Sequence, residues 1–231
     1  MAKLMMVADG MGGMNAGEVA SELATKSTAH FLLNSMHWLI HPTEPEIENF
    51  IEDLKDAACF SHSVVRDESD VIPQHRGMGT TLTLAWLVWP LLHVLHVGDS
   101  RCYISRDGQL QLLTHDQTLA QHLMDRGDLD AEQMRESPFQ HVLMSAIGAE
   151  GQPEAVVYRQ HMQAGDRLLL CTDGVNHHLT DDDIGQILRS PHSAPTICQN
   201  IVDLANERGG QDNITVVVAI LKGLPNSKVN P

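Results

Sequence analysis

Four aspartates occupy the same kind of position in this sequence, at the junction between an apolar run and a turn. They are Asp9, Asp99, Asp173 and Asp212, and each has a glycine within two residues. Any one of them is explained by an ordinary tight turn, because aspartate and glycine are common turn residues. Together they indicate something more specific, since the ends of several strands in one sheet can bring their side chains into a single cleft.

A cluster of four carboxylates needs positive charge. Without a cation the side chains repel one another, and some of them must stay protonated. Carboxylate oxygens are the ligands that Mg²⁺ and Mn²⁺ prefer. Two such ions held a few ångströms apart can lower the pKa of a bridging water and direct it at a phosphorus atom. The pattern is therefore compatible with a metal site of this kind, with a set of ordinary turns as the alternative.

The elements that position these aspartates follow from the hydrophobic pattern. Alternating or continuous apolar runs predict strands, and apolar residues three and four positions apart predict helices. Asp107-Gly108 between two such runs predicts a hairpin turn. The predicted strands are 1–9, 80–88, 91–97, 101–106, 109–114, 155–161, 167–171 and 214–221, and the predicted helices are 16–39, 43–65, 181–189 and 194–207. Helices and strands fall into separate blocks, which favours an α+β layered fold with antiparallel sheets.

The two N-terminal helices each have an apolar side. In the first helix this side carries Val19, Leu23, Ser27, Phe31 and Leu32. In the second helix it carries Ile47, Phe50, Ile51, Leu54, Ala58 and Val65. A loop is expected over 70–78 after the second helix. Residues 117–150 are polar and mixed in character, which predicts short helical pieces without a regular pattern.

Composition excludes several classes of partner. The chain has 231 residues and a formal net charge of −15, so phosphate-rich nucleic acid and anionic membrane surfaces would repel it. The hydrophobic fraction of 42% is ample for a packed core. We expect residues 1–222 to form one domain and 223–231 to form a polar tail. A phosphorylated substrate would need local positive charge in so acidic a protein, and bound metal ions would provide it.

Cysteine and histidine usage points to a cytoplasmic protein without a motif-defined zinc site. None of the four cysteines forms a Cys-x-x-Cys pair, which favours reduced thiols. No run of apolar residues reaches transmembrane length, and the N-terminal run is too short for a signal peptide. The fourteen histidines contain no His-Glu-x-x-His motif, and His177-His178 is the only adjacent pair. We interpret them as surface or hydrogen-bonded histidines.

Six short motifs, in a fixed order along the chain, carry a family resemblance. They are Val7-Ala-Asp-Gly-Met-Gly-Gly13, Gly17-Glu18, Gly77-Met-Gly-Thr-Thr81, Val97-Gly-Asp-Ser-Arg101, Cys171-Thr-Asp-Gly174 and Asp212-Asn213-Ile214-Thr215. With these motifs the sequence resembles bacterial members of the metal-dependent Ser/Thr protein phosphatases, the PP2C or PPM family. The resemblance implies a four-layer α/β/β/α sandwich of two antiparallel sheets flanked by helices. It also implies hydrolysis of phosphoserine and phosphothreonine with two Mn²⁺ or Mg²⁺ ions and a possible third.

The resemblance also implies a role for each matching residue. Asp9 corresponds to the carboxylate that bridges both metals, and Gly10 to the backbone-carbonyl ligand of the first. Asp173 and Asp212 correspond to the ligands of the second metal, and Asp99 to a ligand of the third. Asp9, Asp173 and Asp212 would thus act in catalysis through a metal-activated water. Implied partners are phosphorylated proteins, bacterial eukaryotic-type Ser/Thr kinases and their substrates, with the chain acting as a monomer.

The sequence departs from the family pattern in its N-terminal strand. Family members begin with an arginine that holds the phosphate and with an Asn-Glu-Asp run, and neither motif occurs here. We interpret this as a misassigned start or a shortened chain in preference to a degenerate relative, because the other ligand positions match. The alternative function is a catalytically impaired module that binds phosphoproteins or kinases. Arg76 and Arg101 are not assignable as replacements from the sequence.

Two further positions differ from familiar members. Met11 stands where eukaryotic members have a histidine proposed as general acid, although bacterial members commonly carry methionine there. The donor of the leaving-group proton is therefore unassigned, with His115 and Asp116 as neighbours in sequence only. Residues 117–150 resemble the variable flap beside the family's active site. Within them, Ser145 stands where an arginine is usual.

Overall fold

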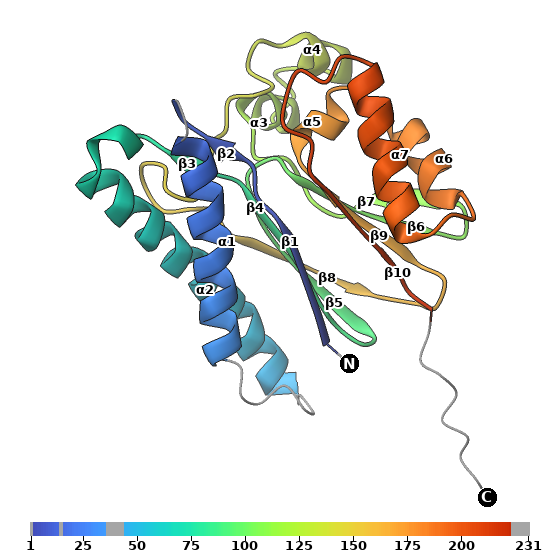
Figure 1. Ribbon diagram of the computed structural model, residues 1–231, viewed down its shortest axis with the longest axis horizontal. Helices are drawn as coiled ribbons and strands as arrows, with labels where there is room; N and C mark the ends of the chain where they lie inside the picture. The colour runs from blue at the N-terminus through green and yellow to red at the C-terminus, as the bar shows by residue number, and fades with distance from the viewer. Residues whose placement is uncertain (1, 14–15, 36–43, 223–231) are drawn as a thin grey trace, which may run out of the picture.

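The computed structural model describes residues 2–13, 16–35 and 44–222. Two four-stranded antiparallel sheets pack face to face, and a pair of long helices covers the outer face of each sheet (Figure 1). The predicted α+β fold with four layers is therefore confirmed. Among the described residues, no helix combines the length and the apolar character needed to cross a membrane.

The strands follow the predicted blocks closely. The first sheet has the order β1 (Ala2–Val7), β4 (Leu82–Val88), β5 (Leu91–Val97) and β8 (Val156–His161). The second has the order β10 (Val216–Ile220), β9 (Arg167–Cys171), β6 (Arg101–Arg106) and β7 (Gln109–Leu112). A two-stranded ribbon pairs β2 (Gly10–Met11) with β3 (Gly79–Thr80). The predicted strand 80–88 is thus divided between β3 and β4, with Thr81 between them.

The long helices pack in pairs and three shorter ones lie near the site. Helices α1 (Ala16–Ser35) and α2 (Glu44–Val71) cover the first sheet, and α6 (Asp181–Arg189) and α7 (Ala194–Glu207) cover the second. The shorter helices are α3 (Leu119–Asp125), α4 (Ala131–Glu136) and α5 (Asp173–Asn176). The loop predicted over 70–78 contains the last two residues of α2 and a 3₁₀ turn, Pro73–His75. Residues 36–39 of the first predicted helix and Thr43 lie outside the described residues.

Burial on both faces explains why the inner strands β4 and β9 are almost continuously apolar. In β4, Leu84 and Trp86 face the layer under α1 and α2, whereas Ala85 and Leu87 face the second sheet. In β9, Leu168 faces the first sheet and its neighbours pack toward α6 and α7. Each fully buried leucine contributes about 1.5–3 kcal/mol relative to an exposed one. The three apolar layers between four structural layers therefore hold the sandwich together.

The buried side of α1 includes the predicted residues, of which Ser27 and Leu32 are buried, and extends beyond them. Its centre is formed by Ala16, Ala20 and Ala24, all almost completely buried, whereas Val19 and Leu23 are only partly buried at the edge. The small side chains allow α2 to approach closely, because a larger residue would hold the two helices apart. A hydrogen bond of 3.0 Å joins the Oγ atoms of Ser27 and Ser61 in this interface. The apolar side predicted for α2 is confirmed at four positions: Phe50, Leu54, Ala58 and Val65 are buried.

The predicted hairpin between β6 and β7 is confirmed. Asp107 has a φ of 49° and Gly108 has a φ of 80°. Both central residues of a type I′ turn require positive φ, which Asp-Gly tolerates better than most pairs. The turn therefore sets the register in which Arg106 pairs with Gln109.

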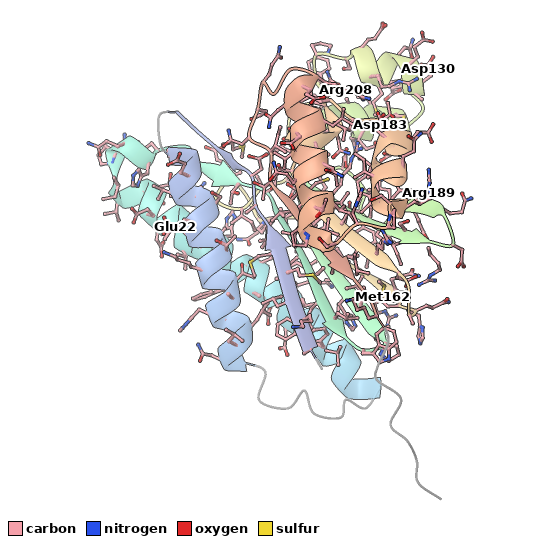
Figure 2. The ribbon with its side chains drawn as sticks, turned by 45° about the vertical axis from the view of Figure 1, so that its right-hand side comes forward. Glu22, Asp130, Met162, Asp183, Arg189 and Arg208 are labelled. Atoms are coloured by element: carbon pink, nitrogen blue, oxygen red, sulfur yellow. The ribbon has the colours of Figure 1, made fainter. Side chains whose placement is uncertain are left out.

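An ion pair links the outer helices of the second sheet. Asp183 in the first turn of α6 lies close to Arg208 at the end of α7 (Figure 2), with Nη1–Oδ2 at 2.6 Å and Nη2–Oδ1 at 2.8 Å. The Asp183 carboxylate also accepts from the backbone N–H of Thr180 and so caps α6. Arg208 donates further to the carbonyl of His178. These contacts attach the loop that follows α7, which carries Asp212, to the body of the protein.

Strand direction decides where the predicted site residues meet. Strands β1 and β5 run the same way, because each is antiparallel to β4. Both end at the same end of the sandwich as β9, and helices α3, α4 and α5 gather there (Figure 1). Asp9, Asp99 and Asp173 follow β1, β5 and β9, and Asp212 precedes β10. All four aspartates consequently lie at one end of the two sheets.

Candidate metal centre

Two threonines hold the backbone of Asp9. The N–H of Asp9 donates to Oγ1 of Thr81 at 2.9 Å, and the N–H of Thr81 donates back to the carbonyl of Asp9 at 2.9 Å. Oγ1 of Thr80 donates to the same carbonyl at 2.8 Å. The pair predicted to favour a strand therefore also anchors the first site residue. Because Thr81 binds Asp9 in this way, it interrupts the strand that the sequence predicts from residue 80.

Glycines allow the backbone around Asp9 and Asp99 to pack closely. A Cβ on Gly10 would lie 1.9 Å from the carbonyl oxygen of Gly17, so no side chain fits beside Asp9. Gly98 has a φ of 105°, and a Cβ there would lie 2.6 Å from Cγ2 of Thr81. The same threonine therefore contacts the segments of both aspartates. The side chain of Gln117 accepts from the Gly98 N–H at 2.8 Å and fixes the turn from the other side.

Asp173 and Asp212 are brought together by a second set of backbone contacts. The Thr172 hydroxyl donates to the carbonyl of Asn213 at 3.1 Å and accepts from the N–H of Thr215 at 3.0 Å. A Cβ on Gly174 would lie 2.5 Å from the Asn213 carbonyl oxygen. Only glycine therefore allows the start of α5 to lie against the loop that carries Asp212. This contact is the structural reason for the Asp-Gly pair at residues 173–174.

The four carboxylates interact strongly. The pKa of Asp9 rises to about 8, first because the group is buried, then because its carboxyl shares a hydrogen bond with Asp173, and then because the charges of Asp173, Asp212 and Asp99 repel its own. Burial raises the pKa of Asp99 to about 7, and the charge of Asp173 adds to the effect. In the metal-free protein, protons bound to Asp9 and Asp99 thus neutralise part of the negative charge that a cation would otherwise neutralise. The structure brings together all four predicted aspartates.

The chemistry of this cluster fits a hard divalent cation. Ionised carboxylates are acceptors only, so oxygens that face one another need either a proton or a metal between them. Oδ1 of Asp173 is buried and has no hydrogen-bond partner. An orphaned carboxylate oxygen is costly unless a cation compensates it. The donor set consists of oxygens, which are the ligands of Mg²⁺ and Mn²⁺.

The carboxylates adjoin a cleft of about 540 Å³ lined by Asp99, Arg101, Asp173 and His177, among others. Arg101 is not available to bind an anion, because its guanidinium makes a bidentate ion pair with Asp116 and also donates to Tyr103. The sequence alone could not show whether Arg101 is paired or free to bind an anion. Arg76 does not line this cleft.

Arg135 and His177, which line this cleft, and His141, which lines the cleft beside it, were missed from the sequence. Arg135 of α4 lines this cleft and a neighbouring one, and it forms no ion pair or hydrogen bond with any side chain that the structure describes. His177 lies one turn after Asp173, with Nε2 3.4 Å from Oδ2, and its ring packs edge-on against His141 with centroids 4.3 Å apart. Burial lowers the pKa of His177 despite the nearby Asp173. The adjacent pair His177-His178 was the only sequence signal.

His115 and Asp116, the two sequence neighbours considered as proton donors, are both paired with other side chains, and the flap residue Ser145 is buried. His115 pairs with Asp125 at 2.7 Å on an exposed surface, and Asp116 is held by Arg101. Ser145 is buried, and its Oγ accepts from the N–H of Glu154 at 2.9 Å. Ser145 therefore serves the packing of its own loop. The predicted short helices of 117–150 are confirmed as α3 and α4.

We expect Gly174→Ala to separate the two loops of the centre. The new methyl would overlap the Asn213 carbonyl, a backbone atom that cannot rotate away, so the free energy of unfolding should fall by about 1–3 kcal/mol. Mg²⁺ affinity, measured by calorimetry, should fall at least about 10-fold because Asp173 and Asp212 move apart. The control is Gly13→Ala, where a Cβ would meet no atom within 4 Å. Equal stability and affinity in the two variants would contradict the role given to Gly174.

Comparisons with known proteins identify similar chains. A family model described as protein phosphatase 2C matches residues 1–215. The serine/threonine protein phosphatase PstP of Mycobacterium tuberculosis is 36% identical over 219 residues, which are 94% of this chain and 40% of that protein. The serine/threonine phosphatase stp of Listeria monocytogenes is 33% identical over 220 residues, which are 93% of this chain and 83% of that protein. The chain thus spans well under half the length of PstP but most of the length of the Listeria protein.

Solved structures agree with the sequence comparisons. The crystal structure of the M. tuberculosis phosphatase PstP/Ppp superposes with a TM-score of 0.84 at 35% identity, covering 95% of this chain and 88% of that one. The catalytic domain of PstP in complex with two manganese ions superposes with a TM-score of 0.78 at 34% identity, covering 93% and 86%. The second of these relatives binds metal in a fold that this chain shares.

Proposed function

This chain belongs to the protein phosphatase 2C family, and from that premise we propose that it hydrolyses phosphoserine and phosphothreonine in proteins with the help of divalent cations. The observation that carries the proposal is the convergence of Asp9, Asp99, Asp173 and Asp212. Two of these carboxylates have strongly raised pKa values, and one has an orphaned oxygen. Such a cluster is unstable without positive charge, and cations that stabilise it can also attract the phosphate group of a substrate.

We propose the following ligands. Asp9 and the Gly10 carbonyl would hold a first ion, Asp9, Asp173 and Asp212 a second, and Asp99 a third, weaker one. Mn²⁺ and Mg²⁺ are the expected ions; bound there, they supply positive charge for the phosphate and lower the pKa of water. The chain itself positions the oxygens through Thr81, Thr172 and the close-packed glycines. Asp9, Asp173 and Asp212 are thus the residues on which turnover depends.

Similar proteins and the free cysteines support a class of substrate and a location. The substrates would be phosphorylated proteins, including bacterial eukaryotic-type Ser/Thr kinases and the proteins that these kinases modify. The similarity to the mycobacterial and Listeria phosphatases supports this class. All four cysteines are free, which supports a reducing compartment such as the cytoplasm. We expect the protein to act as a monomer, which sedimentation would test.

The experiment is hydrolysis of a phosphothreonine peptide with Mn²⁺ or with EDTA. We expect phosphate release with Mn²⁺, none with EDTA, and full recovery when excess Mn²⁺ is returned. The alternative, a module that binds phosphoproteins without turnover, predicts peptide binding without phosphate release. Absence of release from folded protein that is shown by calorimetry to bind Mn²⁺ would refute the proposed activity.

A further inference from the structure

One group of metal-binding side chains in the structure contains nitrogen. His141, Asp173 and His177 each offer one ligand atom, and these three atoms lie within 4.8 Å of one another. Asp173 belongs to the carboxylate cluster, but the two histidines do not. His177 comes from the end of α5, and His141 comes from the turn that follows α4. The group therefore joins two segments that are far apart in the sequence.

The spacing between His177 and Asp173 suits a shared metal better than a direct hydrogen bond. Nε2 of His177 is 3.4 Å from Oδ2 of Asp173, beyond the usual range for a nitrogen–oxygen hydrogen bond. Two ligand atoms about 2.1 Å from a tetrahedral ion lie about 3.4 Å apart. The residues are four positions apart, at the first residue of α5 and at its C-cap, which puts both on the same side of the helix. This pair is therefore already arranged as two corners of a tetrahedron.

The backbone on either side of His141 is held in place. The N–H of Leu119 donates to the carbonyl of Val142 at 2.8 Å, and the N–H of Met144 donates to the carbonyl of Gln117 at 2.8 Å. The His141 ring meets the His177 ring edge-on with centroids 4.3 Å apart. The ligand atom of His141 lies within 4.8 Å of the ligand atoms of Asp173 and His177. A small rotation of the exposed His141 side chain would bring this atom to coordination distance from a shared ion.

We propose that His141, His177 and Asp173 form a second metal site, which takes zinc-type ions and is distinct from the all-oxygen site. Imidazole ligands favour Zn²⁺ and its neighbours in the first transition row, whereas Mg²⁺ and Mn²⁺ prefer carboxylate and carbonyl oxygens. Three protein ligands leave a fourth position open to water, as in exchangeable zinc sites. An ion in this site ties the segment of residues 137–144 to α5 and shares Asp173 with the carboxylate cluster.

Cobalt absorption spectroscopy distinguishes the two sites without any measurement of turnover. Co²⁺ in a tetrahedral site with nitrogen ligands absorbs visible light strongly, whereas Co²⁺ in an octahedral oxygen site absorbs weakly. One equivalent of Co²⁺ is added to the protein in saturating Mg²⁺, which occupies the all-oxygen site. We expect an intense visible band that one equivalent of Zn²⁺ abolishes. A weak octahedral spectrum alone would overturn the proposal and leave the two rings as a packing contact.

Matched variants assign the band to these residues. His141→Asn and His177→Asn should each weaken Co²⁺ binding at least about 10-fold, because each removes one of three ligands. His122→Asn, which removes an exposed imidazole from α3, should leave the band unchanged. Bands of equal intensity and affinity in all three variants would overturn the assignment. Because binding is read directly, an inactive protein that still shows the band would refute the proposed phosphatase and leave this site intact.

Amide hydrogen exchange tests the connection between the two segments. With Zn²⁺ in saturating Mg²⁺, the amides of Val142 and Met144 should exchange more slowly in the parent protein. In His141→Asn the same addition should have no effect on these amides. Equal slowing in the parent and the variant would show that zinc acts elsewhere and would overturn the proposal.

Discussion

Asp173→Asn should reduce turnover of a phosphothreonine peptide by about 1000-fold or more in saturating Mn²⁺. The substitution removes one negative charge and one oxygen ligand from the centre of the cluster, where electrostatic stabilisation is strongest. The asparagine side chain has nearly the same shape, so the backbone contacts around Thr172 and Gly174 remain. The measurement is kcat in Mn²⁺, with folding checked by circular dichroism.

The same variant should be more stable than the parent protein when metal is absent. Asp173 raises the pKa of Asp9 both through a shared hydrogen bond and through repulsion, and this repulsion opposes folding. Its removal should therefore raise the melting temperature in EDTA at about pH 8. A variant that loses activity while gaining metal-free stability is not simply misfolded. Asp56→Asn, an exposed aspartate of α2, is the control for loss of one charge. Turnover within about 10-fold of the parent would exclude Asp173 as an essential ligand.

The metal-free protein should lose stability as the pH rises from about 6.5 to about 8, and Mg²⁺ should abolish the loss. Asp9 has a pKa of about 8 when folded, against 3.8 for an ordinary aspartate. In this range the folded state holds a proton that the unfolded chain has released, so the free energy of unfolding falls with pH. For Asp9 alone the fall is about 1–2 kcal/mol over the window. Asp99, with a pKa of about 7, adds to it in the lower part.

Below about pH 6.5 two buried histidines act in the opposite direction. Burial lowers the pKa values of His93 and His96 to about 4, against 6.5 for an ordinary histidine. Between those values the unfolded chain binds more protons than the folded protein, so stability rises with pH. Between about pH 4.5 and 6 this rise is cancelled by the opposite contributions of Asp9 and Asp99, so metal-free stability should be nearly constant there and should fall at higher pH. The clean test of the aspartates therefore lies above about pH 6.5.

Melting temperatures in EDTA and in Mg²⁺ across this range give the measurement. The stabilisation by Mg²⁺ should grow with pH, because the ion replaces the protons that hold the carboxylates together. Asp9→Asn should flatten the metal-free curve above about pH 6.5, since the largest titrating group is gone. A parent curve that is already flat or rising there in EDTA would show that the carboxylates do not interact as the structure indicates.

Local sequence patterns determined most of the secondary structure. The hairpin at Asp107-Gly108 depends on two adjacent residues that tolerate positive φ, so its signal is complete within a few positions. Strands such as β4 and β9 could be predicted because burial on both faces demands a continuous apolar run. The buried side of α1 was predicted at Ser27 and Leu32, but the alanines at its centre were missed, because alanines carry a weak hydrophobic signal. Their burial reflects the close approach of α2, which no local pattern contains.

The same division applies to the site. The four aspartates were identifiable from sequence, because each lies within two residues of a glycine where an apolar run meets a turn and the six motifs occur in a family order. Their convergence required the strand order, which directs β1, β5 and β9 toward one end. Whether a cationic side chain is free also depends on distant neighbours. Arg101 is occupied by Asp116, whereas Arg135 remains unpaired among the described residues.

The sequence by itself determined which chemistry the protein carries, because carboxylates, glycines and threonines act through their own functional groups and through the turns they favour. Only the tertiary structure decided which of those groups meet. His141 and Asp173 are separated by the two strands β8 and β9 along the chain, yet they lie within one cluster. Contacts of this kind depend on the packing of whole layers, since burial and strand direction bring distant segments together without leaving a local signal in either of them.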